Sequence, residues 1–184
     1  MEKELRILIL EDVPTDAELI ERQLQKAGIA FSSRHVETRE DFIKGLAEFI
    51  PDLILADQKL PAFDGLSALE ISQEKCPDTP FIFVTGSMGE EWAVESLKKG
   101  ATDYVLKDKL YRLVPAIQRA LQEVEEQKER RRLESELRQR LDEVEKMNKL
   151  IVGRELKMEE LRTEIKRLKA RVEALEGRGG HHVF

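Results

Sequence analysis

The sequence predicts an α/β fold: a doubly wound, five-stranded parallel sheet, followed by a long C-terminal α-helix that forms a coiled coil. Across residues 5–121, short apolar runs alternate with segments of helical periodicity. This alternation is typical of parallel sheets with helices on both faces and right-handed crossovers. A second observation predicts the long helix. No aromatic residue lies between Tyr111 and Phe184, and the stretch is dense in Glu, Lys, Arg and Leu, which suits a helix and not a globular core.

The first elements follow from apolar spacing and from turn residues. The run Leu5–Leu10 predicts a strand. The next segment has apolar residues at helical spacing, and we expect Gly28 to end that helix. The more polar run Phe31–Val36 suits an edge strand. Thr38 and Asp41 resemble a capping box for a second helix. The apolar stripe of that helix consists of Phe42, Ile43, Leu46, Phe49 and Ile50.

The central strand is predicted at residues 52–56, where four apolar residues in succession indicate burial on both faces. A third helix then extends up to Pro77. The run Phe81–Thr85 predicts the fourth strand, and residues 90–99 predict a helix that ends at Gly100. The run Asp103–Lys107 completes the alternation.

Polar side chains end four of these apolar runs. Glu11 and Asp12 follow the first strand, Asp57 the third, Thr85 the fourth and Lys107 the fifth. Since open α/β sheets bind ligands at the carboxyl ends of their strands, we expect these groups to meet at one edge. Simpler interpretations remain open: a turn-capping Asp57, a structural ion pair for Lys107, and an ordinary strand residue at Thr85.

Several further residues stand at fixed offsets from these strand ends. They are Glu11-Asp12, Asp57 with Leu60-Pro61 and Gly65, Thr85, and the Asp-Tyr-Val-Leu-Lys run that ends in Lys107. Together these residues resemble the receiver domain of two-component response regulators over roughly residues 5–121. The resemblance implies a flavodoxin-like sheet order of 2-1-3-4-5. One departure is visible, because Asp108 stands where the family usually has Pro.

Converging carboxylates need a cation, since each close pair repels by about 4 kcal/mol at an effective dielectric constant near 20. All-oxygen ligands suit Mg²⁺. The resemblance implies that Asp12, Asp57 and the backbone carbonyl of Lys59 ligate Mg²⁺ and that Glu11 acts through water. It also implies phosphorylation on Asp57. The remaining implied roles are phosphoryl binding by Thr85 and Lys107 and a conformational switch formed by Thr85 and Tyr104, for which plain sheet packing of Tyr104 is the alternative.

An enzyme would use the same acids differently. Phosphatases with a nucleophilic Asp generally place a second Asp two residues later as acid or base, and Lys59 occupies that position here. We therefore expect a phosphoacceptor with at most slow self-dephosphorylation, not an enzyme.

The C-terminal stretch has a heptad pattern in which spacings of four and three alternate. Its apolar seam contains β-branched residues at position a and Leu at position d, which favours a parallel two-stranded coiled coil. Arg140 and Arg154 interrupt the seam, and Gly153 weakens the helix. Docking on another protein's helices is the alternative. The apolar seam residues are Leu133, Leu137, Val144, Met147, Ile151, Met158, Leu161, Ile165, Leu168, Val172 and Leu175.

Composition limits the classes of function. The net charge is −6, which argues against nonspecific nucleic-acid binding, and no apolar run approaches the roughly 18 residues that a membrane span needs. The single cysteine, Cys76, excludes an internal disulfide and favours a reducing, cytoplasmic location. We expect a receiver at 1–121, a helix continuous with it at 122–176, and a disordered tail at 177–184.

Three functions fit this organisation. The first is a phosphorylation-gated receiver whose partners are a sensor histidine kinase or phosphotransfer protein and a second copy of the chain, with no nucleic acid and no membrane. The second is a constitutive dimeric adaptor whose acidic site is unused. The third is a fragment of a larger sensor kinase or cyclase.

Overall fold

The computed structural model describes residues 4–61, 63–86 and 90–176, which form two compact units at 1–129 and 130–184. In the first unit, five strands form one parallel sheet in the order β2-β1-β3-β4-β5, so the predicted sheet order is confirmed and β3 is central. The strands are β1 (Leu5–Leu10), β2 (Phe31–Val36), β3 (Leu53–Ala56), β4 (Phe81–Thr85) and β5 (Asp103–Leu106).

Helices follow the strands as the alternation predicts. A 3₁₀ segment precedes the last helix, and Pro115 lies in that helix's first turn, where a proline is tolerated. The helices are α1 (Pro14–Lys26), α2 (Arg39–Lys44), the π-helical η1 (Gly45–Phe49), α3 (Gly65–Lys75), α4 (Glu90–Lys98), the 3₁₀ η2 (Lys107–Arg112) and α5 (Leu113–Glu176).

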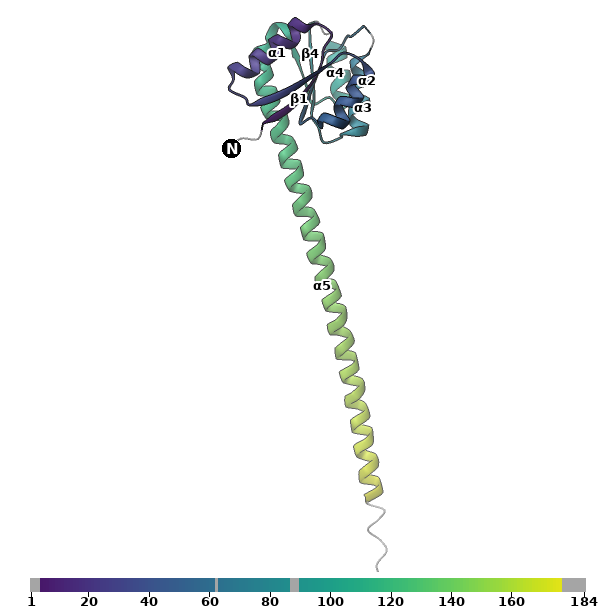
Figure 1. Ribbon diagram of the computed structural model, residues 1–184. Helices are drawn as coiled ribbons and strands as arrows, with labels where there is room; N and C mark the ends of the chain where they lie inside the picture. Colours follow the sequence, from purple (N-terminus) through teal and green to yellow (C-terminus); the bar gives the residue numbers. More distant parts are fainter. Residues whose placement is uncertain (1–3, 62, 87–89, 177–184) are drawn as a thin grey trace, which may run out of the picture. The chain divides into compact units, whose positions relative to one another are not determined.

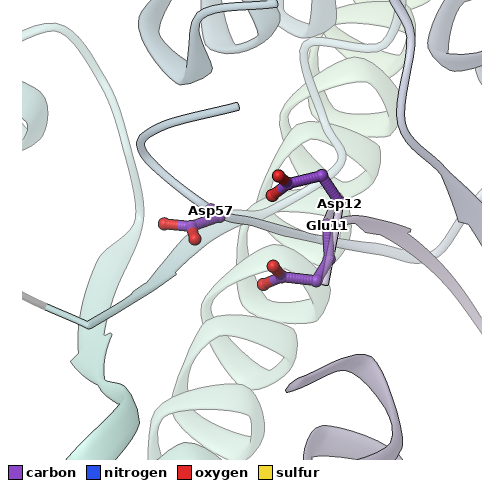
Figure 2. Close-up of side chains that lie close together, drawn as sticks. All are labelled: Glu11, Asp12 and Asp57. Atoms are coloured by element: carbon purple, nitrogen blue, oxygen red, sulfur yellow. The ribbon is translucent and has the colours of Figure 1, made fainter. Parts of the chain in front are cut away.

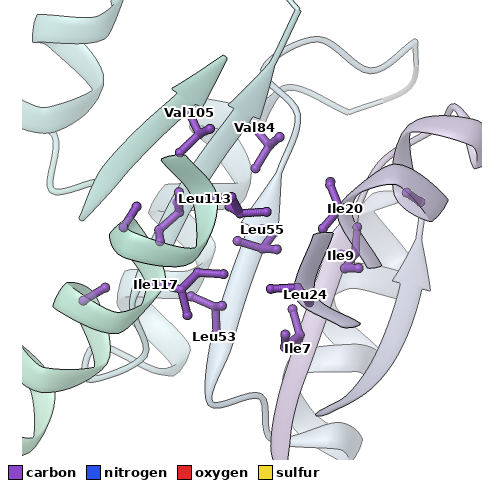
Figure 3. Close-up of a cluster of buried hydrophobic side chains, with 14 residues drawn as sticks. Ile7, Ile9, Ile20, Leu24, Leu53, Leu55, Val84, Val105, Leu113 and Ile117 are labelled. Carbon is purple, nitrogen blue, oxygen red and sulfur yellow. The ribbon is translucent and has the colours of Figure 1, made fainter. Parts of the chain in front are cut away.

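Two apolar layers cover the sheet because alternate strand residues face opposite sides. On one side, Ile7 and Ile9 of β1 pack with α1 and the start of α5 (Figures 1 and 3). On the other side, Leu8 and Leu10 pack with α2 and α3. All four of these residues are fully buried, so the sheet is a rigid platform for the loops at its carboxyl edge.

The second helix departs from its expected apolar stripe. Thr38 caps α2 as predicted, accepting a hydrogen bond from the Asp41 backbone N–H, and Phe42 and Leu46 are buried. The prediction for Ile50 was wrong, because its side chain is 59% exposed and its φ is +50°. The cause is the π-helical turn at Gly45–Phe49, which changes the phase of the last turn and ends it in a left-handed residue.

The second unit contains the continuation of α5, a single helix that ends at Glu176. Among the residues that the structure describes, no helix combines the length and the apolar character needed to cross a bilayer. The expected disordered tail at 177–184 lies outside the described residues.

Candidate functional site

The carboxyl edge of the sheet brings three acids together from two strands. Glu11 and Asp12 follow β1, and Asp57 follows β3, its direct neighbour in the sheet. Carboxylate oxygens of all three lie within 4.8 Å of one another, and Figure 2 shows the three side chains close together. Glu11 is almost completely buried, whereas the other two are partly exposed. The predicted acidic cluster is therefore present.

Backbone hydrogen bonds fix the position of Asp57. Its N–H donates to the carbonyl oxygen of Leu10 at 2.9 Å, which continues the pairing of β3 with β1 by one residue. Its Oδ1 accepts a hydrogen bond from the N–H of Gln58 at 2.6 Å. The Asp57 side chain is only 12% exposed, so its carboxylate is partly desolvated. Its other oxygen, Oδ2, lies beside Lys107.

Gly65 allows the loop after β3 to fold back on the site. Its N–H donates to the carbonyl oxygen of Gln58 at 3.1 Å, and Lys59 pairs with Asp64 in an isolated antiparallel bridge. The Asp64 carboxylate then caps α3 by accepting from the N–H of Ser67. These contacts fold the described residues of the loop, 57–61 and 63–65, back toward Asp57.

The Lys107 ammonium group forms ion pairs with three carboxylates of the site. Its Nζ lies 2.8 Å from Asp57 Oδ2, 2.8 Å from Glu11 Oε2 and 2.6 Å from Asp16 Oδ2. Burial disfavours the ammonium charge, but the hydrogen bonds to Asp16 and Asp57 and the ion pair with Glu11 outweigh it and raise the pKa of Lys107. The ammonium is therefore a fixed positive charge beside Asp57, as the sequence predicts.

For Glu11, burial has a larger effect on the pKa than the ion pair with Lys107. Burial raises the pKa of its carboxyl group, and the contact with Lys107 only partly offsets that effect. The other oxygen, Oε1, accepts a hydrogen bond from the N–H of Val13 at 3.2 Å. Glu11 is thus held in the interior by a cation on one side and the backbone of the β1–α1 turn on the other.

Sequence reasoning missed Asp16, which contributes the shortest of the three contacts to Lys107. Asp16 is the third residue of α1, and its side chain is 29% exposed. One sequence pattern could have identified it. Asp16 is an acidic residue in the first helical turn after a strand that Glu11-Asp12 follow. Taken alone, that pattern is equally typical of an acid that stabilises a helix N-terminus.

The predicted switch residues lie on β4 and β5. Thr85 is buried at the end of β4, in register with Leu106, which directly precedes Lys107. Tyr104 is partly buried in the same apolar layer as Trp92. The Trp92 ring meets Phe83 edge to face at 4.8 Å, so it is half-buried on α4. A switching role for Thr85 and Tyr104 stays a prediction.

The acidic cluster fits a hard divalent cation. Carboxylate oxygens from Glu11, Asp12 and Asp57 are the ligand type that Mg²⁺ prefers, and Asp12 and Asp57 are partly exposed, which leaves room for water ligands. Lys59, whose carbonyl was expected to complete the set, is in the loop directly after Asp57. Its coordination stays a prediction.

The seam residues of α5 are exposed within a single chain. The ten seam residues from Leu133 to Val172 have exposed fractions of 44–60%, which is large for a row of aliphatic side chains. The Leu175 side chain lies outside the described residues. Leu141, Leu150 and Leu156 are also exposed, so the apolar surface is broader than the seam in the middle of the helix.

A family model described as response regulator receiver domain matches residues 7–118. LuxO, a luminescence regulatory protein of Vibrio campbellii, is 35% identical over 99 residues, which are 54% of this chain and 21% of LuxO. The DNA-binding transcriptional regulator NtrC of Proteus hauseri is 31% identical over 124 residues, 67% of this chain and 26% of NtrC. The chain thus spans about a quarter or less of these relatives.

Solved structures give the same fold. A CheY-like response regulator receiver domain protein from Methanospirillum hungatei has a TM-score of 0.60 and 28% identity, with 68% of this chain and 99% of that chain covered. NtrX from Brucella abortus has a TM-score of 0.64 and 25% identity, with 71% of this chain and 30% of that chain covered.

Proposed function

This chain belongs to the response regulator receiver family, and from that premise we propose that it accepts a phosphoryl group on Asp57 and signals through protein–protein contacts. The observation that carries the proposal is the position of Asp57, with Lys107 at 2.8 Å on one side and the carboxylates of Glu11 and Asp12 on the other. A nucleophile, a fixed cation and a metal-binding oxygen set meet at one sheet edge.

The chemistry is an in-line transfer to a carboxylate. An Asp57 oxygen attacks the phosphorus of an acyl phosphate or phosphohistidine donor. The new O–P bond forms while the bond to the donor breaks, and the leaving group takes the electron pair. Lys107 and the Thr85 hydroxyl group bind the phosphoryl oxygens. Positive charge that is already fixed beside the nucleophile needs little reorganisation when negative charge moves onto these oxygens.

Mg²⁺ is the proposed cofactor. Asp12, Asp57 and the Lys59 backbone carbonyl would hold it, with Glu11 acting through a water molecule. When bound, the ion neutralises charge on both the carboxylate and the anionic donor. Glu11 suits an indirect role because it is buried and already contacts Lys107.

We further propose that the chain is not a dedicated hydrolase. The side chain two positions after Asp57 is Lys59, which is exposed and is not a carboxylic acid. It offers no carboxylate to activate a water molecule for attack on the aspartyl phosphate, so hydrolysis proceeds slowly. The phosphorylated state then persists long enough to act as a signal.

The proposed partners are a sensor histidine kinase or phosphotransfer protein in the cytoplasm and a second copy of this chain. Rearrangement of Thr85 and Tyr104 would transmit phosphorylation to the face formed by α4, β5 and the start of α5. The second copy pairs along the seam of α5. In parallel pairing, Glu164 faces Lys169 of the partner subunit and their charges attract, whereas Lys157 faces Arg162 of the partner subunit and their charges repel.

Phosphodonor labelling tests the proposal. The wild type and Asp57→Asn are incubated with acetyl phosphate and Mg²⁺, and the added phosphoryl group is detected by intact-mass spectrometry. We expect labelling of the wild type that hydroxylamine removes and EDTA prevents, and none in Asp57→Asn. Asp142→Asn, an exposed aspartate on α5, is the matched control and should label normally. A wild type that stays unlabelled would favour a constitutive adaptor with an unused acidic site.

A further inference from the structure

Asp16 belongs to the site by distance, although the receiver resemblance assigns it no role. Its Oδ2 lies 2.6 Å from Lys107 Nζ, closer than either Asp57 or Glu11. The residues come from distant parts of the chain, with a sequence separation of 91. Two flexible side chains from such distant elements meet at a single point beside the phosphoacceptor.

The first turn of α1 fixes the backbone position of Asp16. Pro14 occupies the first position of α1, where its fixed φ favours the helical conformation, and the Asp16 N–H donates to the Val13 carbonyl oxygen at 3.0 Å. Ala17, the next residue, is buried against the sheet. The backbone that carries Asp16 is therefore fixed on the same platform as the strand ends.

The hydrogen-bonding capacity of the ammonium group decides what Asp16 does. Lys107 has three N–H donors, and three carboxylates surround it. If Asp57 becomes an aspartyl phosphate, its carboxyl group becomes part of a mixed anhydride and loses its charge, and the phosphoryl oxygens become the stronger acceptors. One donor then moves from Asp57 to a phosphoryl oxygen. Asp16 and Glu11 keep their contacts, and these hold the nitrogen in place during that exchange.

We propose that Asp16 is a positioning residue that holds the Lys107 ammonium group toward the phosphoryl group on Asp57. This inference rests on the proposed function for its effect on phosphoryl transfer. Without Asp16, Lys107 retains its charge, but Glu11 is the one of the three carboxylates that still holds it once Asp57 is phosphorylated. A lysine side chain has many rotamers, so the ammonium group then moves more freely. The ammonium then spends less time in the orientation that transfer requires.

The first test compares Asp16 variants by acetyl phosphate labelling in the presence of Mg²⁺. Asp16→Ala should lower the maximal labelling rate about tenfold, since small misplacements of catalytic groups are costly. The acetyl phosphate concentration for half-maximal rate should change by less than about twofold, because no donor contact is removed. Asp16→Asn retains an oxygen acceptor and should restore most of the rate. Asp16→Ser is too short to reach Lys107 and should resemble Asp16→Ala, which gives a second deletion variant if Asp16→Ala folds poorly.

A double-mutant cycle separates positioning from a general effect on the fold. In a Lys107→Ala background, Asp16→Ala should change the rate by less than about twofold, because Asp16 acts through Lys107. An equal loss in both backgrounds would overturn the proposal.

A readout that does not depend on phosphoryl transfer completes the test. Ammonium hydrogens held in ion pairs exchange slowly enough to give a ¹H–¹⁵N NMR signal, which Lys107→Arg assigns by its loss. We expect the Lys107 signal in the wild type and in Asp16→Asn, and its disappearance in Asp16→Ala. If the wild type takes no phosphoryl group, the proposed function fails and this signal alone decides the role of Asp16. Its persistence in Asp16→Ala would refute positioning.

Discussion

A Cβ atom on Gly65 would lie 2.6 Å from the backbone oxygen of Asp57, far inside van der Waals contact. It would also lie 2.9 Å from the Phe83 ring and 3.0 Å from the Gln58 oxygen. Two of these neighbours are backbone atoms of the loop that carries the phosphoacceptor, so they cannot rotate away. The absence of a side chain at Gly65 is thus a condition for the position of Asp57.

We predict that Gly65→Ala lowers the free energy of unfolding by about 2 kcal/mol, because an added methyl group in a packed region forces backbone shifts. Labelling of Asp57 by acetyl phosphate should fall as well, since the loop must move. Urea denaturation and intact-mass spectrometry measure the two effects. Gly153→Ala is the matched control. Nothing lies within 4 Å of an added Cβ there, and the free energy of helix formation should become more favourable by about 1 kcal/mol. Equal effects at the two glycines would contradict the steric argument.

A second prediction concerns the cation at the centre of the site. Lys107→Met should lower the free energy of unfolding by about 3 kcal/mol in EDTA, because three carboxylates lose their common partner in a largely buried position. Mg²⁺ should stabilise this variant more than the wild type, since the ion replaces the missing positive charge. Urea titrations with EDTA or Mg²⁺ measure the difference.

Lys109→Met provides the control, because that side chain is exposed. It should change the stability by less than about 0.5 kcal/mol in either buffer. The electrostatic interpretation fails if Mg²⁺ stabilises Lys107→Met no more than the wild type.

The third prediction uses pH and a contact remote from the site. Glu21 Oε1 lies 2.5 Å from Ser33 Oγ and 2.9 Å from His35 Nε2. Burial acts to raise the pKa of Glu21, but these hydrogen bonds outweigh it and lower the pKa. A lowered carboxyl pKa contributes stability above the ordinary value of 4.5, and this stability is lost as the pH falls through the folded-state pKa.

Glu21→Gln should therefore cost about 1 kcal/mol at neutral pH, and the difference from the wild type should shrink as the pH falls below about 4. Free energies of unfolding between neutral and acidic pH measure it. Glu18→Gln, in an exposed pair with Arg22 on the same helix, should have little effect at any pH. A Glu21→Gln difference that is constant with pH would contradict the assigned shift.

The parts of the site that the sequence predicted share one physical reason. Apolar runs indicate where parallel strands end, and strand ends of a parallel sheet share an edge, so Glu11, Asp57 and Lys107 could be placed together without coordinates. Distances and directions between these groups depend on the folded structure. The same reasoning predicted β3 as the central strand, because a strand buried on both faces leaves a continuous apolar run.

Other features depend on tertiary contacts that leave no local pattern. The position of Asp16 in the chain does not reveal that its carboxylate reaches Lys107, since the same residue could only stabilise the start of α1. The exposure of Ile50 depends on the π-helical turn before it, and ordinary helical spacing predicts burial instead. Gly65 is present in the family pattern, but its steric reason appears only when Asp57 and Phe83 surround it.

The last prediction concerns the seam of α5. Leu161 and Leu168 occupy d positions and are 44% and 53% exposed within one chain, so pairing with a second copy would bury them. We predict that Leu161→Asp combined with Leu168→Asp converts a dimer into a monomer, because two carboxylates per helix would enter the apolar interface. Light scattering gives the mass of each species.

Thr163→Asp combined with Ala170→Asp is the matched control, because it adds the same two charges at f positions on the opposite side of the helix, where exposed side chains face away from the seam. It should remain dimeric. The Leu161→Asp, Leu168→Asp variant should still label on Asp57, since the receiver unit contains every residue of the proposed site. A wild type that is monomeric at micromolar concentration would refute pairing with a second copy. A control that dissociates as readily as the Leu161→Asp, Leu168→Asp variant would show that charge on the helix, and not the seam, determines association.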